Sequence, residues 1–318
     1  MADSSSGKVA ERKKHSFLVN FLIRLVKEKP LGTVGLVITL LLLFVGIFAN
    51  FIAPYGMNES HGVENYLSPP SAQFWLGTDS MGRDVLTRII YGARVSMIVG
   101  LSSAFLGMVG STALGILSGY IGGKFDLIFQ RFVDAWMCLP GLVTLMVLMN
   151  ILGRGMFTLI IAMGGFGSIG ASRVKRSAVI AIKENVYVQA AVAIGCSRTR
   201  ILIRHILPNI MGVVIIGFTM GVPGFIMNEA SLSFLGFGLP PPSPSWGSMI
   251  TTSKSIMVDY PWLIIWPGLA LAIVVYGVNM FGDAMRDLLD PRLRGGGGRY
   301  GIRAEKAKEK VSPALQRD

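Results

Sequence analysis

Residues 31–53 read LGTVGLVITLLLLFVGIFANFIA, a run of 23 residues without a charged side chain. A helix rises about 1.5 Å per residue, so roughly 20 apolar residues cross the ~30 Å hydrocarbon layer of a bilayer. The run is therefore long enough to span a membrane. The preceding residues are polar and basic and offer no small-residue cleavage site at a suitable position, so we expect a retained first helix and not a signal peptide.

The composition extends this interpretation to the rest of the chain. Hydrophobic residues make up 52% of the 318 residues, charged residues only 15%, and the mean hydropathy is +0.56. A soluble domain of this length needs more charge to cover its surface. We predict an all-α integral membrane protein with no separate soluble domain. Its six transmembrane helices are expected at 31–53, 95–121, 133–152, 156–172, 211–236 and 262–283.

The basic residues indicate the orientation, because cytoplasmic loops collect Lys and Arg. With the N-terminus in the cytoplasm, 25 of the 30 basic residues fall in the tails and loops on that side. The five on the outer side are Arg83, Arg88, Arg94, Arg154 and Lys254. Six spans with both termini in the cytoplasm follow. The net charge of +12 is then explained by topology and anionic lipid, and a nucleic-acid partner is not needed.

Four parts are expected along the chain. Residues 1–30 form a cytoplasmic tail, 31–79 the first span and an external loop, 80–290 a core with the other five spans, and 291–318 a flexible basic tail. A short interfacial helix is predicted at 83–94.

The second span carries a ladder of small residues at every fourth position: Gly107, Ser111, Gly115, Gly119 and Gly123. Such a ladder lets two helix backbones approach closely. A helix of this chain is favoured slightly over one of a partner subunit.

The cytoplasmic loop 173–210 is long and basic, yet strongly helix-forming. From Lys183 it reads KENVYVQAAVAIGCSRTRILIRHILPNI. Apolar side chains on one arc of a helix are Val186, Ala190, Ala193 and Ile194. Gly195 can end that helix in a left-handed conformation. We predict a short helix across the membrane face, whose small alanines would permit insertion into a groove of a partner.

This loop resembles the EAA loop of ABC importer permeases, the coupling helix that docks on the ATPase in that family. The matching residues are Gln189-Ala190-Ala191, then Gly195 after three intervening residues, and a block that ends Leu207-Pro208. The usual motif has Glu at the first position and Ile at the start of the last block. Gln189 and His205 stand there instead, as is familiar in the peptide/nickel branch.

Further stretches resemble the C-type permease of dipeptide and oligopeptide importers. They are FIAPY (51–55), WLGTDSMGRDVLTRIIYGARVS (75–96), EASLSFLGFGLPPPSPSWG (229–247), PWLIIWPGLA (261–270) and NMFGDAMRDLLDPRL (279–293). The resemblance implies a type I ABC importer permease fold and peptide transport across a bacterial or archaeal cytoplasmic membrane. It also implies a sister permease in a heterodimer, an external solute-binding protein and one or two ATPase subunits. ATP and Mg would bind to the ATPase, and this chain would hold no cofactor.

The residues that we expect to take part in coupling are Glu184, Tyr187, Gln189, Ala190, Ala191 and Gly195, with Leu207 and Pro208 fixing the exit into the fifth span. Glu229, preceded by Asn228, is the one acid well within an apolar run, and it lies near the outer mouth. Two interpretations stay open: it lines the outer gate or substrate path, or it is an interfacial acid satisfied by hydroxyls such as those of Ser231 and Ser233.

Other chemistry finds little support. The GxGxxG at 165–170 lies in a membrane span and lacks the strand and the acid of a dinucleotide site. Gly122-Gly123-Lys124 lacks the first Gly and the Ser or Thr after Lys of a phosphate loop, so no ATP site is expected in this chain. No metal triad or Ser/His/Asp set can be assembled, since the three histidines, His15, His61 and His205, lie far apart in the predicted topology. Within the family, nickel, glutathione or an oligosaccharide is the alternative cargo. A secondary transporter or channel would show more charges at mid-membrane depth or an inverted repeat.

Overall fold

The structure is a computed structural model that describes residues 17–289. Between these residues the chain forms helices and no β-strand. The helices are α1 (Phe17–Glu28), α2 (Pro30–Ile47), α3 (Ala49–Ile52), α4 (Val85–Ile121), α5 (Gly123–Met137), α6 (Gly141–Leu152), α7 (Met156–Lys183), α8 (Val186–Ala193), α9 (Arg198–Ile201), α10 (Leu207–Phe234), α11 (Trp246–Ser253) and α12 (Trp262–Leu289). The predicted tail 291–318 and most of the tail 1–30 lie outside the described residues.

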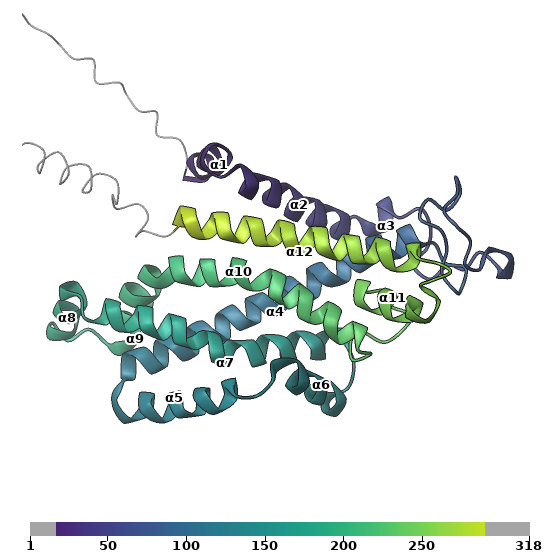
Figure 1. The fold of residues 1–318 in the computed structure, drawn as a ribbon. Helices are drawn as coiled ribbons and strands as arrows, with labels where there is room; N and C mark the ends of the chain where they lie inside the picture. The colour runs from purple at the N-terminus through teal and green to yellow at the C-terminus, as the bar shows by residue number, and fades with distance from the viewer. Residues whose placement is uncertain (1–16, 290–318) are drawn as a thin grey trace, which may run out of the picture.

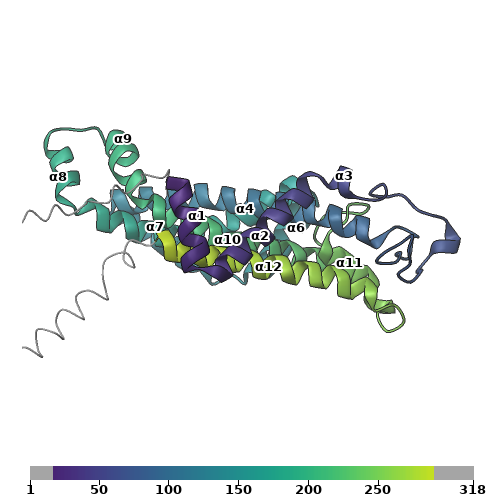
Figure 2. The ribbon, with the colours of Figure 1, turned by 90° about the horizontal axis from the view of Figure 1, so that it is seen from above.

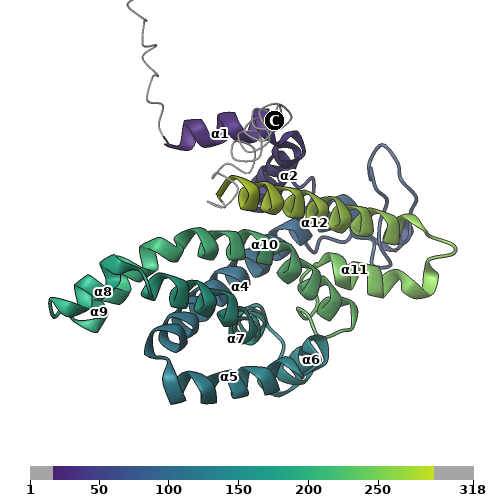
Figure 3. The same ribbon diagram turned by 60° about the vertical axis from the view of Figure 1, so that its left-hand side comes forward.

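The long helices form one bundle with two distinct ends (Figures 1 and 3). Five segments are long and apolar enough to cross a membrane: α2, α4, α7, the continuous stretch Arg198–Phe234, and α12. The pair α5 and α6 carries the chain from the end of α4 back to the start of α7 (Figure 1) and counts as a sixth candidate span when the bent pair is taken as one. The all-α fold is confirmed, and the described residues hold five to six candidate spans.

The third predicted span is wrong as one straight helix over 133–152. Helix α5 ends at Met137, α6 begins at Gly141, and the two axes meet at 89°. Pro140 lies in the break. Its ring lacks an N–H and disfavours a helical conformation at Leu139, so the helix stops there.

Two other helices are longer than predicted. The expected separate interfacial helix at 83–94 is instead the first part of α4, a single helix of 37 residues. Asp84 caps it, because its Oδ2 accepts the backbone N–H of Thr87 at 2.7 Å. Helix α7 continues beyond the predicted end at residue 172 to Lys183, so the first part of the predicted loop is helical.

The small-residue ladder of α4 packs against α7, as the sequence favoured. A Cβ on Gly115 would lie 2.7 Å from the carbonyl oxygen of Ser172, and one on Gly119 would lie 2.9 Å from that of Arg176. Gly164 of α7 permits the same close approach near the other end, since a Cβ added there would lie 2.9 Å from the carbonyl oxygen of Ser103. The two backbones are therefore in direct contact over most of α7.

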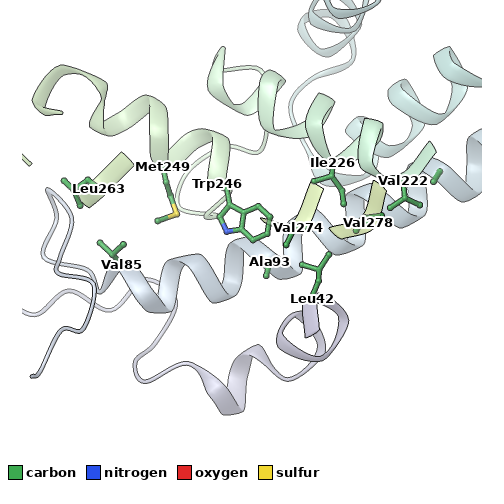
Figure 4. Packing of buried hydrophobic residues seen from close by; sticks show 11 residues of the cluster. Leu42, Val85, Ala93, Val222, Ile226, Trp246, Met249, Leu263, Val274 and Val278 are labelled. Carbon is green, nitrogen blue, oxygen red and sulfur yellow. The ribbon is translucent and has the colours of Figure 1, made fainter. Parts of the chain in front are cut away.

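A second core lies at the end of the bundle that holds α11. The Trp246 side chain of α11 is buried among residues of α2, α4, α10 and α12 (Figure 4). Its Nε1 donates a hydrogen bond to the carbonyl oxygen of Ile89 at 3.1 Å. Gly92 gives the indole room, since a Cβ there would approach the ring to 2.9 Å. This core fixes the entry of α4 against three other membrane helices.

Ion pairs join the helices at the opposite end. Lys29 Nζ lies 2.5 Å from Asp287 Oδ2 and ties the start of α2 to the end of α12. Arg176 of α7 pairs with Asp126 of α5, whose Oδ1 also accepts the Ser118 hydroxyl of α4 at 2.5 Å.

We predict that Gly115→Val lowers the stability of the protein, because the new side chain must push α7 away from α4. Overpacking of this kind costs about 1–3 kcal/mol. Gly165→Ala on α7 is the matched control, since its Cβ would meet no atom within 4 Å. Thermal unfolding of the purified complex should show a lower midpoint for Gly115→Val alone. Equal midpoints would contradict the proposed close contact.

Candidate functional site: an exposed helix between two membrane spans

Helix α8 extends beyond the bundle at the end where α1 begins and α12 finishes (Figures 1 and 2). It follows α7 after only Glu184 and Asn185, and it is joined to α10 by α9 and a π-helical turn, Leu202–Ile206. Both ends of α8 therefore connect to membrane-crossing helices through very short links. A displacement of α8 must act on α7 and α10.

Backbone geometry ends α8 sharply at the predicted position. Gly195 has φ +78°, its N–H donates to the carbonyl oxygen of Val192, and the Cys196 N–H donates to that of Ala191. A left-handed residue after the last turn is the common way to satisfy terminal carbonyl groups of a helix. Ser197 then caps α9 by accepting the N–H of Arg200 at 3.4 Å. The predicted role of Gly195 in ending the helix is confirmed.

One face of α8 holds it to the bundle. Val188, only 1% exposed, and Ala191 pack in an apolar cluster. Its buried members come from α7, α8, α9, the π-helical turn and α10: Val179, Val188, Ala191, Ile201, Ile206, Ile210 and Val214. Among the predicted coupling residues, Ala191 therefore faces inward. It can position α8 but offers no surface to a partner.

The other face of α8 is open. Val186 is 82% exposed and Ile194 is 80% exposed, and Ala190 between them is also exposed. Leaving large apolar side chains in water is unfavourable, and a contiguous apolar patch commonly marks an interaction site. These three residues belong to the arc that the sequence singled out, and we call Val186, Ala190 and Ile194 the apolar arc of α8.

Polar contacts fix the link between α7 and α8. Lys183 Nζ donates to the carbonyl oxygen of Tyr120 at 2.7 Å and lies over the Tyr120 ring, which ties the end of α7 to the end of α4. Gln189 Nε2 donates to the carbonyl oxygen of Glu184 at 3.2 Å. The Tyr187 ring lies 6.4 Å from that of His205 on the π-helical turn.

The remaining predicted coupling residues fall around the exit of this segment. Glu184 is exposed at the end of α7, Leu207 is half-buried against the apolar cluster, and Pro208 stands in the first turn of α10, where a missing N–H does no harm. The structure thus brings all eight residues into one connected segment, with different exposures.

The predicted substrate-path residues lie far from α8, toward the other end of α10. Glu229 has no exposed surface, while Asn228 is half-buried. Ser233 donates to Glu229 Oε1 at 2.7 Å, as expected, and Ser96 Oγ lies 3.5 Å from Oε2. The Ser231 hydroxyl instead donates to the carbonyl oxygen of Met227. Of the two open interpretations, the geometry favours the one in which hydroxyl groups satisfy the Glu229 carboxylate. It does not favour the one in which Glu229 lines the outer gate or the substrate path.

The sequence matches two family models. Residues 111–295 match the binding-protein-dependent transport system inner membrane component, and residues 16–70 match the N-terminal membrane domain of oligopeptide transport permease C. The first match covers more than half of the chain and includes α7, α8 and α10. The chain belongs to this family of ABC importer permeases.

Named relatives support the assignment of this permease along most of its length. It is 36% identical to the oligopeptide transport system permease protein OppC of Bacillus subtilis over 92% of this chain and 95% of that protein. The dipeptide transport system permease protein DppC of Alkalihalophilus pseudofirmus is also 36% identical, over 85% and 88% of the two chains. The glutathione transport system permease protein GsiD of Escherichia coli is 35% identical over 86% and 90%.

A solved structure supports the fold of the permease. A chain of the MetNI methionine ABC transporter, in an inward-facing conformation, superposes with a TM-score of 0.53 at 17% identity. The match covers 64% of this chain and 96% of that one. This likeness shows the fold alone, and the family match assigns the chain to the ABC importer permeases, not to the secondary transporters or channels.

Two buried basic residues escaped the sequence analysis. Lys175, assigned to the cytoplasmic loop, is buried in α7 next to Gly217 of α10. Arg88, counted only as an outer basic residue, is buried in the first turn of α4. From the sequence alone, a basic residue at either position is equally compatible with an exposed loop or with the membrane interface. The structure shows that α4 begins earlier and α7 ends later than predicted, which encloses both side chains.

We predict that Val188→Ala loosens α8 from the bundle, whereas Val186→Ala leaves its packing unchanged. Truncating the buried valine removes apolar contacts and leaves a gap, at a cost of about 1–2 kcal/mol, while the exposed valine has few contacts to lose. Amide hydrogen exchange across residues 186–194 should become faster in Val188→Ala alone. Equal protection in the two variants would refute the assignment of the inner face.

Proposed function

We propose that this permease moves peptides across the cytoplasmic membrane and that a separate ATPase subunit drives it by docking on α8. One observation carries the docking proposal: the apolar arc of α8 is exposed on a helix whose opposite face is anchored in the bundle. Such a helix presents a firm apolar surface to a partner, while its short links pass force to α7 and α10.

The orientation of the permease follows from the same end of the bundle. The start of α1, the end of α12 and α8 gather there (Figure 1), and so do most of the basic residues of the described chain. Because Lys and Arg collect on the cytoplasmic side, we place both termini and α8 in the cytoplasm. The external segment 53–84 and α11 would then face a solute-binding protein.

The rest of the importer would complete the pathway. We propose that a sister permease of similar fold lies beside this chain, that the two enclose the route as a heterodimer, and that one or two kinds of ATPase subunit bind ATP and Mg inside. Binding and hydrolysis of ATP on the ATPase would move α8. Because α7 is packed closely against α4, these two helices would then move together. Packed helices switch between discrete arrangements in this manner.

The relatives support a peptide cargo. The names of two of them specify oligopeptide and dipeptide transport, and that of a third specifies glutathione transport. Glutathione remains the alternative with direct support from a relative, and nickel or an oligosaccharide would use a similar frame. Uptake of labelled dialanine and of glutathione by proteoliposomes that contain the assembled importer discriminates among these cargoes.

We predict that Val186→Glu combined with Ile194→Glu abolishes docking of the ATPase and therefore uptake. The two carboxylates would put charge into an apolar contact, where burial of an unpaired charge is strongly unfavourable. Val63→Glu, on the exposed external segment, is the matched control. Copurification of the ATPase with tagged permease is the measurement, and full copurification of the double variant would refute the docking proposal.

Gly195→Pro should also abolish uptake while membrane insertion is retained. Proline fixes φ near about −65° and has no N–H, so it can neither adopt the φ of +78° nor donate to Val192. Helix α8 would lose its terminal turn. Insertion is checked by membrane fractionation, and normal peptide uptake in this variant would contradict the role of the α8 geometry.

Thiol labelling tests the orientation. In a Cys138→Ser background, Cys196 is the remaining cysteine and lies one residue after Gly195. A membrane-impermeant maleimide should label it in inside-out vesicles and fail to label it in intact cells. Labelling from outside intact cells would invert the proposed topology.

A further inference from the structure

A cavity of about 580 Å³ lies at the end of the bundle opposite α8. Its walls come from the segment that leads into α4, the loop that follows α10, and α11, which lie together in Figure 1. A volume of this size falls within the range of small-molecule sites in proteins, about 300–1,000 Å³. Three arginines and one aspartate line it, which leaves a net charge of +2: Arg83, Arg88, Arg154 and Asp79.

Arg88 is the most enclosed of these charges. Its side chain is only 8% exposed, and its Nη1 is buried without a hydrogen-bond partner among the described residues. Its ionic contact with Asp79 is long, with Arg88 Nε at 3.5 Å from Asp79 Oδ2. A buried guanidinium with unmet donors is unfavourable, so an anion that reaches it gains more than it would at an exposed arginine.

Asp79 cannot neutralise Arg88 fully, because its oxygens are already engaged. Oδ1 accepts the N–H groups of Met81 at 2.8 Å and of Arg83 at 3.0 Å. Oδ2 accepts Arg83 Nε at 2.8 Å. The aspartate therefore belongs mainly to Arg83 and to its own turn, and Arg88 retains donors for a second anion.

The remaining walls are apolar or carry hydroxyls. Val85, Leu239, Met249 and Leu263 supply apolar surface, and Ser248 and Thr252 supply hydroxyls. Arg154 lies over the Phe237 ring at 5.5 Å and is itself exposed. The cavity thus combines one deep cation, a further positive charge nearer the solvent, and an apolar wall. This combination suits a short molecule with a carboxylate at one end and small side chains along its length.

We propose that this cavity binds the terminal carboxylate of a short peptide on the external side of the permease, with Arg88 as the receiving group. The planar guanidinium matches a carboxylate in geometry as well as in charge. This inference rests on the proposed peptide cargo. An acidic side chain of the solute-binding protein is the competing ligand. The enclosure of Arg88 favours a slender free molecule over the surface of a docked protein.

The test compares two ligands that differ only at the carboxylate. The assembled importer, without its solute-binding protein, is titrated with L-alanyl-L-alanine and with L-alanyl-L-alanine amide at constant ionic strength. Ligand binding to the folded state raises the midpoint of thermal unfolding. We expect the free dipeptide to raise it and the amide to have little effect.

Two variants with opposite expected signs separate binding from misfolding. Arg88→Gln should weaken dialanine binding roughly tenfold or more, since a charged donor to the carboxylate is lost. Asp79→Asn keeps an oxygen for the N–H groups of Met81 and Arg83 but removes the competing charge, so it should tighten binding. Arg131→Gln, an exposed arginine of α5, is the control and should bind like the wild type.

The outcomes are distinct. Equal shifts with the dipeptide and its amide, or a response in Arg88→Gln that equals the wild type, would overturn the assignment. A third result would also overturn it: Arg88→Gln lowers the affinity for the solute-binding protein but leaves the affinity for dialanine unchanged. The cavity would then bind that protein and not the peptide. If the wild type imports dialanine but shows no carboxylate-dependent shift, the cavity assignment alone fails. If it shows the shift and imports no peptide, the proposed cargo fails and the carboxylate site stands.

Discussion

The contact between α4 and α7 is the constraint on which the rest of the permease depends. No hydrophobic effect drives helices together inside a bilayer, so close packing of backbones has to hold them. Gly107, Gly115 and Gly119 on one helix, and Gly164 on the other, permit that approach. Helix α7 continues without interruption from this contact to Lys183, just before α8. A movement of α8 at the proposed ATPase surface would therefore displace α4 and α7 together.

The two ends of the bundle are built by different physics. At the α8 end, ion pairs such as Lys29 with Asp287 and Arg176 with Asp126 join neighbouring helices. At the other end, the Trp246 core is apolar and packs α11 against four membrane helices, α2, α4, α10 and α12. The cavity beside that core carries the enclosed Arg88. A tightly packed end around Trp246, and an exposed α8 held to the bundle at the opposite end, are consistent with the proposal that an ATPase acts on α8.

Much of this arrangement could be predicted from local patterns. The apolar runs predicted the five long apolar helices and the segment that forms α5 and α6. The loops and tails predicted to collect Lys and Arg include the segment that contains α8. The end of α8 at Gly195 followed from glycine's tolerance of positive φ. The predicted helix boundaries that were wrong have one cause. An apolar run shows which residues avoid water, but it does not show where a helix begins, bends or ends. Pro140 is the local signal of the bend between α5 and α6, whereas the apolar run 133–152 by itself predicts a straight helix.

The sequence by itself determined that the chain crosses a membrane about six times, that it carries an importer-type loop, and which residues form that loop. Composition and spacing suffice for this, because the cost of burying charge in lipid is local to each segment. Only the tertiary structure decided which side chains are buried against neighbouring helices and which are exposed. It turned Ala191 inward and Ile194 outward, buried Glu229 among serines, and enclosed Arg88 beside Asp79. Those outcomes depend on neighbours distant in sequence, and the one-dimensional pattern does not record them.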